Sequence, residues 1–215
     1  MDIKILLADD HQIMREGLVA LLEREPGLKV VGEAPDGRVA VRLSRELEPQ
    51  VVVMDVTMPD LNGIDATRQI LAENRHIKVI ALSMHSNRQF VKGMLQAGAS
   101  AYLLKQSASQ ELIKAIQLVM AGRVYLSPEI AGIVVEDYTA PAADNSAFAV
   151  LTPREREVLQ LFAEGKSPRE IAWALHLGLK TVEAYRRQIM EKLNFSNFAD
   201  LVKYAIREGL TSLDI

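Results

Sequence analysis

Cysteine is absent from the 215 residues of this chain. Disulfide bonds, thiolate zinc sites and cysteine nucleophiles are therefore excluded, and we expect the protein in the reducing cytoplasm. Long apolar runs are also missing at the N-terminus, where only Ile5 to Ala8 is continuously apolar, after Asp2 and Lys4. That run is too short for a signal peptide or a spanning helix, so we expect no membrane association.

A strong excess of one charge is missing as well. Residues 1–148 carry 15 basic and 19 acidic side chains, a net charge of −4, whereas residues 149–215 carry 10 and 9, a net charge of +1. Charge alone is therefore weak support for nucleic-acid binding. With 49% hydrophobic residues and no internal repeat, the composition is that of an ordinary soluble protein of one or two domains.

The first 120 or so residues alternate short apolar segments with longer amphipathic ones. Such alternation predicts parallel strands joined by crossover helices, with helices on both faces of the sheet. A fifth helix is expected from Ser109, as N-cap, to Ala121 before Gly122. The predicted strands are Ile3 to Asp9, Lys29 to Ala34, Val51 to Asp55, Val79 to Met84 and Ala101 to Lys105.

Polar residues stand where the predicted strands end. They are Asp9 and Asp10 on the first strand, Asp55 on the third, Ser83 on the fourth and Lys105, after Tyr102, on the fifth. The second strand ends in Glu33 and Ala34, which we expect to be uninvolved. Because ligands of parallel sheets bind at the carboxyl ends of the strands, these side chains are the candidate site. Taken singly, Asp55 is as often a helix-capping or turn aspartate as a functional one. A lysine such as Lys105 is more often a solvated residue at a strand end, and a serine such as Ser83 is more often a local turn former.

Three carboxylates in one cleft repel each other unless a cation neutralises them, and Mg²⁺ suits such oxygen ligands. Asp10, Asp55 and the backbone carbonyl of Thr57 are the expected ligands, with Asp9 acting indirectly through water. An ionised Asp55 is then a carboxylate nucleophile for phosphorus. Lys105 and the Ser83 hydroxyl would compensate the oxygens of the added phosphoryl group.

The motifs Ile5 to His11, Met54 to Gly63, Leu82-Ser83 and Tyr102 to Lys105 resemble, in order and spacing, the receiver domains of two-component response regulators. The resemblance implies a flavodoxin-like, doubly wound α/β sheet of five parallel strands in the order 2-1-3-4-5. It implies that Asp55 is the phosphoacceptor, that a sensor histidine kinase is the phosphodonor, and that Ser83 and Tyr102 move on phosphorylation. Thr57 and His85 would flank the attacking water in hydrolysis, and His11 is expected to be structural or on the surface.

The C-terminal part predicts four helices, beginning at Pro153, Pro168, Lys180 and Asn197. The first follows a capping box, with Thr152 as N-cap and Glu155 at its third position. A short turn containing Gly178 joins the second and third helices, which is typical of a helix-turn-helix. The third helix is locally positive, although a solvated surface helix would have a similar charge pattern.

Four segments of this part resemble the LuxR-type helix-turn-helix of NarL/FixJ response regulators. They are Leu151 to Leu159, Glu164 to Ser167, Glu170 to Ala172 and Lys180 to Ile189. The resemblance implies base contacts by Glu183, Ala184 and Arg187, and phosphate contacts by Lys180, Thr181 and Arg186. Tyr185 and Leu179 depart from the usual pattern of this family. The departures leave the expectation of DNA binding unchanged, but the resemblance does not fix the half-site that is preferred. A homodimer on promoter DNA would use the last helix, for which the candidates are Phe198, Leu201 and Val202.

The sequence therefore predicts a phosphorylation-controlled transcription regulator that uses Mg²⁺, binds double-stranded promoter DNA and has RNA polymerase as a further partner. The expected domains are a receiver over residues 1–122, a linker over 123–148 with a short helix from Pro128 to about Val135, and an all-α helix-turn-helix domain over 149–215. One rival is a phosphorylation-independent DNA-binding regulator with a receiver-like dimerisation domain. A haloacid-dehalogenase-type phosphatase is a second rival, but it needs an aspartate at Thr57, so we do not expect an enzyme.

Overall fold

A computed structural model describes residues 2–84, 86–139 and 147–211. The chain divides into two compact units, residues 1–140 and 141–215, each described here by itself. In the first unit the strands are β1 (Ile3–Ala8), β2 (Leu28–Ala34), β3 (Val51–Asp55), β4 (Lys78–Ser83), β5 (Ala101–Leu104) and β6 (Tyr125–Leu126). Its helices are α1 (Gln12–Leu22), α2 (Gly37–Leu47), α3 (Gly63–Glu73), α4 (Arg88–Ala97), η1 (Lys105–Ser107), α5 (Ala108–Met120) and α6 (Pro128–Thr139).

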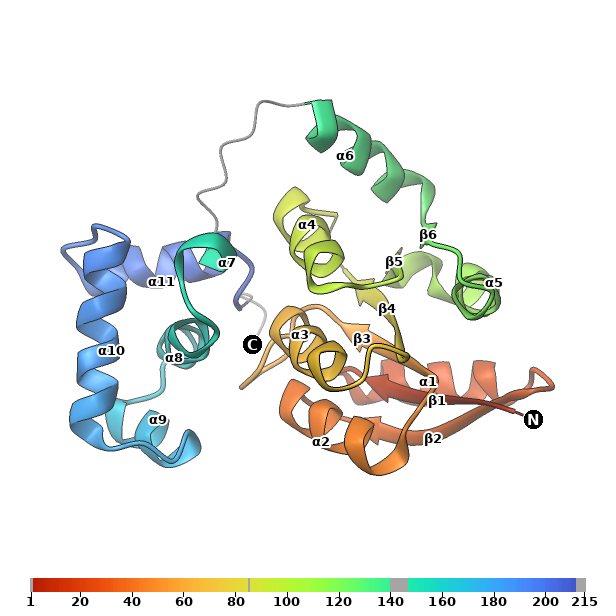
Figure 1. Ribbon diagram of the computed structural model, residues 1–215, viewed down its shortest axis with the longest axis horizontal. Coiled ribbons are helices and arrows are strands. Elements are labelled where there is room, and N and C mark those ends of the chain that lie inside the picture. The colour runs from red at the N-terminus through yellow and green to blue at the C-terminus, as the bar shows by residue number, and fades with distance from the viewer. Residues whose placement is uncertain (1, 85, 140–146, 212–215) are drawn as a thin grey trace. The chain divides into compact units, whose positions relative to one another are not determined.

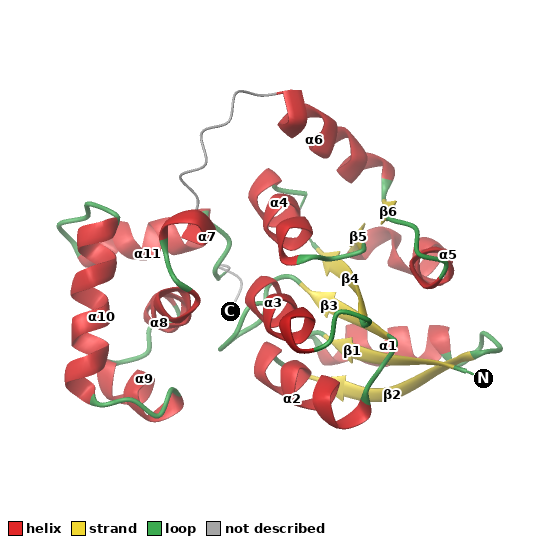
Figure 2. Cartoon of the chain, in the orientation of Figure 1, coloured by secondary structure: helices red, strands yellow, loops and turns green. Residues whose placement is uncertain are grey.

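All strands are parallel, in the order β2-β1-β3-β4-β5-β6, so the predicted order is confirmed and extended by one strand. Helices α2, α3 and α4 cover one face of the sheet, and α1 and α5 cover the other (Figures 1 and 2). The central strand β3 is buried along its whole length, as expected for an apolar strand covered on both faces. This arrangement brings the carboxyl ends of β1, β3, β4 and β5 to one edge.

The sixth strand was not predicted. Residues Tyr125–Leu126 pair with β5, with Leu126 opposite Tyr102, and the Ser127 N–H donates to the Tyr102 carbonyl at 3.1 Å. A strand of two residues has no periodicity that a sequence could reveal. The start of the expected linker is therefore hydrogen-bonded to the sheet beside Tyr102.

The predicted start of the fifth helix is wrong. Strand β5 ends at Leu104, Lys105 begins the 3₁₀ turn η1, and α5 starts at Ala108, so Ser109 lies inside the helix instead of capping it. The 3₁₀ turn leads directly into α5, with the Ala108 N–H donating to the Lys105 carbonyl, and the helix begins without a side-chain cap. Helix α6 begins at Pro128 as predicted and continues to Thr139, beyond Val135.

The second unit is helical. It contains α7 (Ala147–Val150), α8 (Pro153–Ala163), α9 (Pro168–Ala174), α10 (Leu179–Lys192) and α11 (Phe198–Arg207). The capping box at Thr152 and Glu155 is confirmed, and Ser167 with Glu170 forms a second one at α9. Val158, Ile171, Val182, Ile189 and Leu201 are fully buried in its core. Residues 140–146 of the expected linker lie outside the described residues.

None of the helices in the described parts of the chain is both long and apolar enough to cross a bilayer.

Candidate functional site

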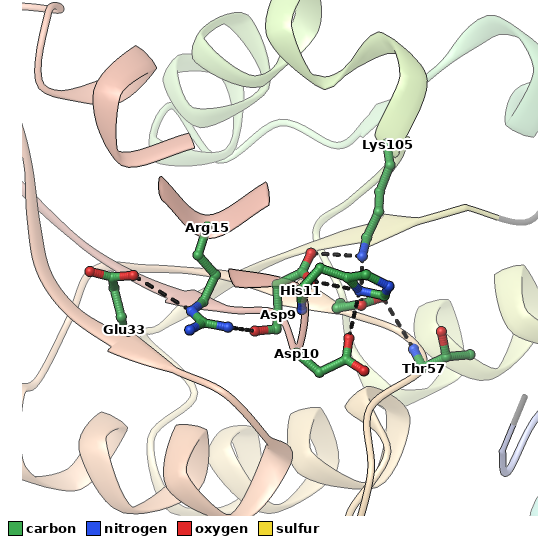
Figure 3. A network of polar contacts seen from close by, with 8 residues as sticks. Asp9, Asp10, His11, Arg15, Glu33, Thr57 and Lys105 are labelled. Carbon is green, nitrogen blue, oxygen red and sulfur yellow. Dashed lines mark hydrogen bonds and ion pairs between the residues drawn. The ribbon is translucent and has the colours of Figure 1, made fainter. Parts of the chain in front are cut away.

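Two buried carboxylates and one buried ammonium meet at the carboxyl edge of the sheet. Asp9 follows β1 and Asp55 ends β3, and both are almost fully buried, at 2% and 1% exposure. They are neighbours because β1 pairs directly with β3, with Ala8 opposite Met54. The Lys105 Nζ lies 2.7 Å from Asp9 Oδ2 and 2.7 Å from Asp55 Oδ2 (Figure 3). The structure thus brings together three side chains from distant parts of the sequence.

Asp10 and His11 lie at the open side of this cluster. The Asp10 side chain is 32% exposed, and its Oδ1 is 2.8 Å from His11 Nδ1. His11 also donates its backbone N–H to Asp9 Oδ1 at 2.9 Å. One possible ligand atom from each of Asp9, Asp10, His11 and Asp55 lies within 4.8 Å of the others. The cluster therefore has the donor set of a divalent cation site, rich in hard oxygen ligands.

The environment of Asp55 opposes its ionisation. Burial and the Asp9 charge raise the pKa of Asp55, Lys105 and the Thr57 N–H lower it, and the net result is a pKa of about 7. Burial lowers the pKa of Lys105, but the neighbouring Asp55 and Asp9 carboxylates outweigh it, and the net direction is upward. Lys105 therefore stays charged, although it does not fully compensate two buried carboxylates.

The remaining predicted residues of this edge surround Asp55. Ser83 and Tyr102 are fully buried, and burial raises the pKa of the Tyr102 phenol, against a hydrogen bond with Ser83 that lowers it. The Thr57 N–H donates to Asp55 Oδ1 at 3.2 Å. The expectation about His85 falls outside the described residues. Ser83 and Tyr102 thus form a linked pair on adjacent strands.

Gly63 is required by the backbone beside Asp55. Its N–H donates to the Val56 carbonyl at 2.9 Å, which starts α3 directly behind the phosphoacceptor candidate. A Cβ at this position would overlap the carbonyl oxygen of Asp55. A side chain here would therefore push the end of β3 out of place.

Two residues at this edge were missed by the sequence analysis. Arg15 donates from Nη1 to the backbone carbonyl of Asp9 at 2.6 Å, and its Nε lies 3.5 Å from Glu33 Oε2 (Figure 3). Glu33 was expected to be uninvolved, and this contact corrects that expectation. The available signal was the position of Arg15 one helical turn after His11, which directs its side chain back toward the end of β1.

The recognition-helix candidate α10 buries one side and exposes the other. Val182 and Ile189 are fully buried, while Lys180, Thr181, Glu183 and Arg187 are exposed and Ala184 is half-buried. Arg186 is half-buried, with its guanidinium 4.9 Å from the ring centre of Phe198 and 6.0 Å from that of Phe162. Arg186 therefore packs on aromatic faces.

The candidates for dimerisation on α11 differ in exposure. Phe198 and Val202 are half-buried, whereas Leu201 is fully buried in the core of the second unit. The Phe198 ring also meets Phe162 edge-on, with 5.8 Å between ring centres. Leu201 thus belongs to the domain core, and of the three candidates Phe198 and Val202 keep exposed surface.

A doubly wound parallel sheet with an acidic cluster and a buried lysine at its carboxyl edge, together with a separate helix-turn-helix unit, defines the class of DNA-binding response regulators. Comparisons with known proteins agree. Residues 5–117 match the response regulator receiver domain, and residues 149–205 match the luxR family of bacterial regulatory proteins.

Several characterised relatives share almost the whole length of the chain. The response regulator GacA of Pseudomonas syringae pv. syringae is 38% identical over 208 residues, covering 97% of each chain. UvrY of Escherichia coli K12 is 37% identical over 212 residues, covering 99% of this chain and 97% of UvrY. The chain therefore belongs to the two-component response regulators of the NarL/FixJ type, with a receiver domain and a LuxR-type DNA-binding domain.

Solved structures give the same result. A LuxR-family response regulator from Aurantimonas sp. SI85-9A1 is 42% identical, with a TM-score of 0.62, and covers 65% of this chain and 100% of its own. The RcsB response regulator in complex with DNA is 27% identical, with a TM-score of 0.61, and covers 97% and 99%. The matched families are those of a regulator that binds DNA, not of haloacid-dehalogenase-type phosphatases.

Proposed function

We propose that Asp55 is the phosphoacceptor and that a cognate sensor histidine kinase is the phosphodonor. One observation carries this proposal: Asp55 ends the central strand, nearly buried, with Lys105 Nζ 2.7 Å from its Oδ2 and the Asp9–Asp10 pair beside it. An Oδ–P bond would form as the P–N bond to the kinase histidine breaks, and the leaving imidazole takes a proton. This self-catalysed step and its reversal by water would be the chain's only chemistry, so we do not assign it an enzymatic reaction on another substrate.

We propose Mg²⁺ as the cofactor, held by Asp10, Asp55 and the Thr57 carbonyl, with Asp9 acting through water. Two features support the fit: the ligand atoms of Asp9, Asp10 and Asp55 lie close together, and the pKa of Asp55 is raised to about 7 by burial and by Asp9. When bound, Mg²⁺ supplies positive charge to the carboxylates and to a phosphoryl oxygen.

The chain's own residues would then stabilise the product. Lys105 Nζ, which contacts Asp55 Oδ2 at 2.7 Å, offers a point charge to one phosphoryl oxygen. The Ser83 hydroxyl, on the strand beside Asp55, donates to another and in doing so gives up its hydrogen bond with Tyr102. Tyr102 is thereby free to reorient, which is the two-state element that a switch requires.

The output of this switch is DNA binding. We propose that Lys180, Thr181 and Arg186 contact phosphates, that Glu183, Ala184 and Arg187 contact bases, and that Phe198 and Val202 pair two copies on promoter DNA. The exposure of most of these residues on one side of α10 supports the first two assignments. A structure of two RcsB dimers bound to two parallel DNAs supports the pairing of copies on DNA, and the surface that Phe198 and Val202 leave exposed supports their place in it. Residues 123–148 would link the two domains in the cytoplasm, and RNA polymerase would be a further partner.

The phosphoacceptor is tested with a small phosphodonor such as acetyl phosphate. Wild type and Asp55→Asn are incubated with the donor and Mg²⁺, and acid-labile phosphate is quantified by Phos-tag electrophoresis. We expect no modification of Asp55→Asn, and normal modification of Asp60→Asn, which removes a half-buried carboxylate in the following loop. Modification of Asp55→Asn at the wild-type rate would show that the assignment is wrong and would favour the phosphorylation-independent regulator.

The recognition helix is tested by DNA affinity. A consensus site is first selected from a random DNA pool, and binding is then measured by fluorescence anisotropy. Arg187→Ala should lose about 1–3 kcal/mol of binding free energy and relax the sequence preference, as expected for a residue that reads bases. The neighbouring exposed Gln188→Ala is the matched control. Equal losses in both variants would contradict the assignment.

A further inference from the structure

We propose that Arg15 is a positioning residue for the acidic pair: it fixes the Asp9–Asp10 peptide and thereby aims the Asp10 carboxylate at the cation. The inference rests on the proposed Mg²⁺ site and adds a residue that does not itself touch the ion. Its basis is the 2.6 Å hydrogen bond from Arg15 Nη1 to the backbone carbonyl of Asp9.

The acceptor of this hydrogen bond determines which part of the chain Arg15 holds in place. The carbonyl oxygen of Asp9 belongs to the planar peptide group that joins Asp9 to Asp10. The backbone on the N-terminal side of Asp9 is already fixed, because the Asp9 N–H donates to the Ala34 carbonyl of β2 at 3.0 Å. With both ends of the residue held, the rotation of the peptide is set, and so is the direction in which the Asp10 side chain leaves the backbone.

Asp10 needs such support because its side chain is more exposed than that of Asp9, with His11 Nδ1 2.8 Å from its Oδ1. Its side chain is 32% exposed, whereas Asp9 is 2% exposed and contacts Lys105 Nζ at 2.7 Å. The N-cap of α1 is His11, whose side chain makes no capping hydrogen bond. The turn between β1 and α1 therefore lacks the usual side-chain cap, and Arg15 supplies a side-chain bond to it from one turn further along the helix.

Arginine suits this position better than lysine. One branch of the guanidinium reaches Asp9, while Nε faces Glu33 Oε2 at 3.5 Å, so a single planar group spans α1, β1 and the end of β2 (Figure 3). The Arg15 side chain is 14% exposed and Glu33 is 46% exposed. The Glu33 contact is more solvated and contributes little, and the part-buried bond to the Asp9 carbonyl carries the positioning.

The test measures Mg²⁺ affinity of the full-length protein by isothermal titration calorimetry, without a phosphodonor, together with the thermal midpoint. Support around metal ligands is commonly worth 10- to 100-fold in metal affinity. We expect Arg15→Ala to weaken Mg²⁺ binding about 10-fold, Arg15→Lys to lose about 3-fold because lysine makes one bond without the fork, and Glu33→Gln to stay within about 2-fold.

A matched control separates positioning from general ion-pair loss. Arg42→Ala removes the surface pair with Glu46, in which both side chains are more than half exposed, and should leave Mg²⁺ affinity unchanged. Wild-type affinity in Arg15→Ala would overturn the inference, as would a Glu33→Gln loss as large as that of Arg15→Ala. If Arg15→Ala does not fold, as judged by circular dichroism, wild-type affinity in Arg15→Lys overturns it instead.

The inference and the proposed function fail in different ways. If wild type binds no Mg²⁺, the proposed site falls and this inference with it. If wild type binds Mg²⁺ and is phosphorylated while Arg15→Ala binds equally well, only the positioning role is wrong.

Discussion

Replacing Asp55 with asparagine should stabilise the metal-free protein at pH 8. Burial and Asp9 raise the pKa of Asp55 from its ordinary value of 3.8 to about 7. Each pKa unit corresponds to about 1.4 kcal/mol, so the ionised form costs the folded state about 4 kcal/mol. Asparagine has the shape of the neutral acid, but its side-chain NH₂ group cannot accept a hydrogen bond from Lys105 as a carboxylate oxygen does. We therefore expect a gain of about 2–4 kcal/mol in the free energy of unfolding.

The sign of the pH dependence follows from linkage. Because the folded pKa lies above the unfolded one, the folded state binds more protons, and wild type loses stability as pH rises from about 4 to about 7. Asp55→Asn lacks this titration, so its advantage should be less than half as large at pH 5 as at pH 8, where it is complete.

Calorimetric scans of both full-length proteins in EDTA at pH 5, 6, 7 and 8 measure this difference. The receiver transition is identified as the one that Mg²⁺ shifts in wild type, and at pH 8 it should lie roughly 5–15 °C higher in Asp55→Asn. A difference that does not change with pH, or a less stable Asp55→Asn at pH 8, would refute the reasoning about the buried carboxylate.

Three further predictions concern other features. Gly63→Ala should destabilise the receiver by about 1–3 kcal/mol, measured by urea unfolding, and slow phosphorylation, because the new Cβ meets the Asp55 carbonyl; normal values of both would contradict the close approach. Thr152→Ala should cost the DNA-binding domain about 0.5–2 kcal/mol through loss of the capping box, with Thr152→Ser as the control. Arg186→Ala should lower the melting temperature of the DNA-binding domain, because the Arg186 guanidinium packs on Phe162 and Phe198. Arg187→Ala, at an exposed position, should not lower it, and equal melting temperatures of the two variants would show that the packing of Arg186 does not stabilise the domain.

The sequence by itself determined the order of strands and helices along the chain and the edge of the sheet at which the functional residues lie. The apolar segment at 51–55 lies in a strand buried along its length, and a polar residue stands at or next to the end of each neighbouring strand. The alternation of apolar and amphipathic segments, with the rule that parallel sheets bind ligands at the carboxyl ends of their strands, therefore indicated the edge where the site lies. The capping box at Thr152 and Glu155 was equally visible, because its bonds join residues three positions apart. Signals of this kind are local and survive in a single sequence.

Tertiary structure alone decided which distant groups meet and how they are supported. The short strand β6 exists because β5 offers it an unpaired edge, and the start of α5 is set by the 3₁₀ turn at Lys105. Arg15 takes its role from a backbone carbonyl on another element, and Asp55 takes its raised pKa from burial beside Asp9. Such effects depend on distances between groups far apart in sequence, and only the folded chain fixes those distances.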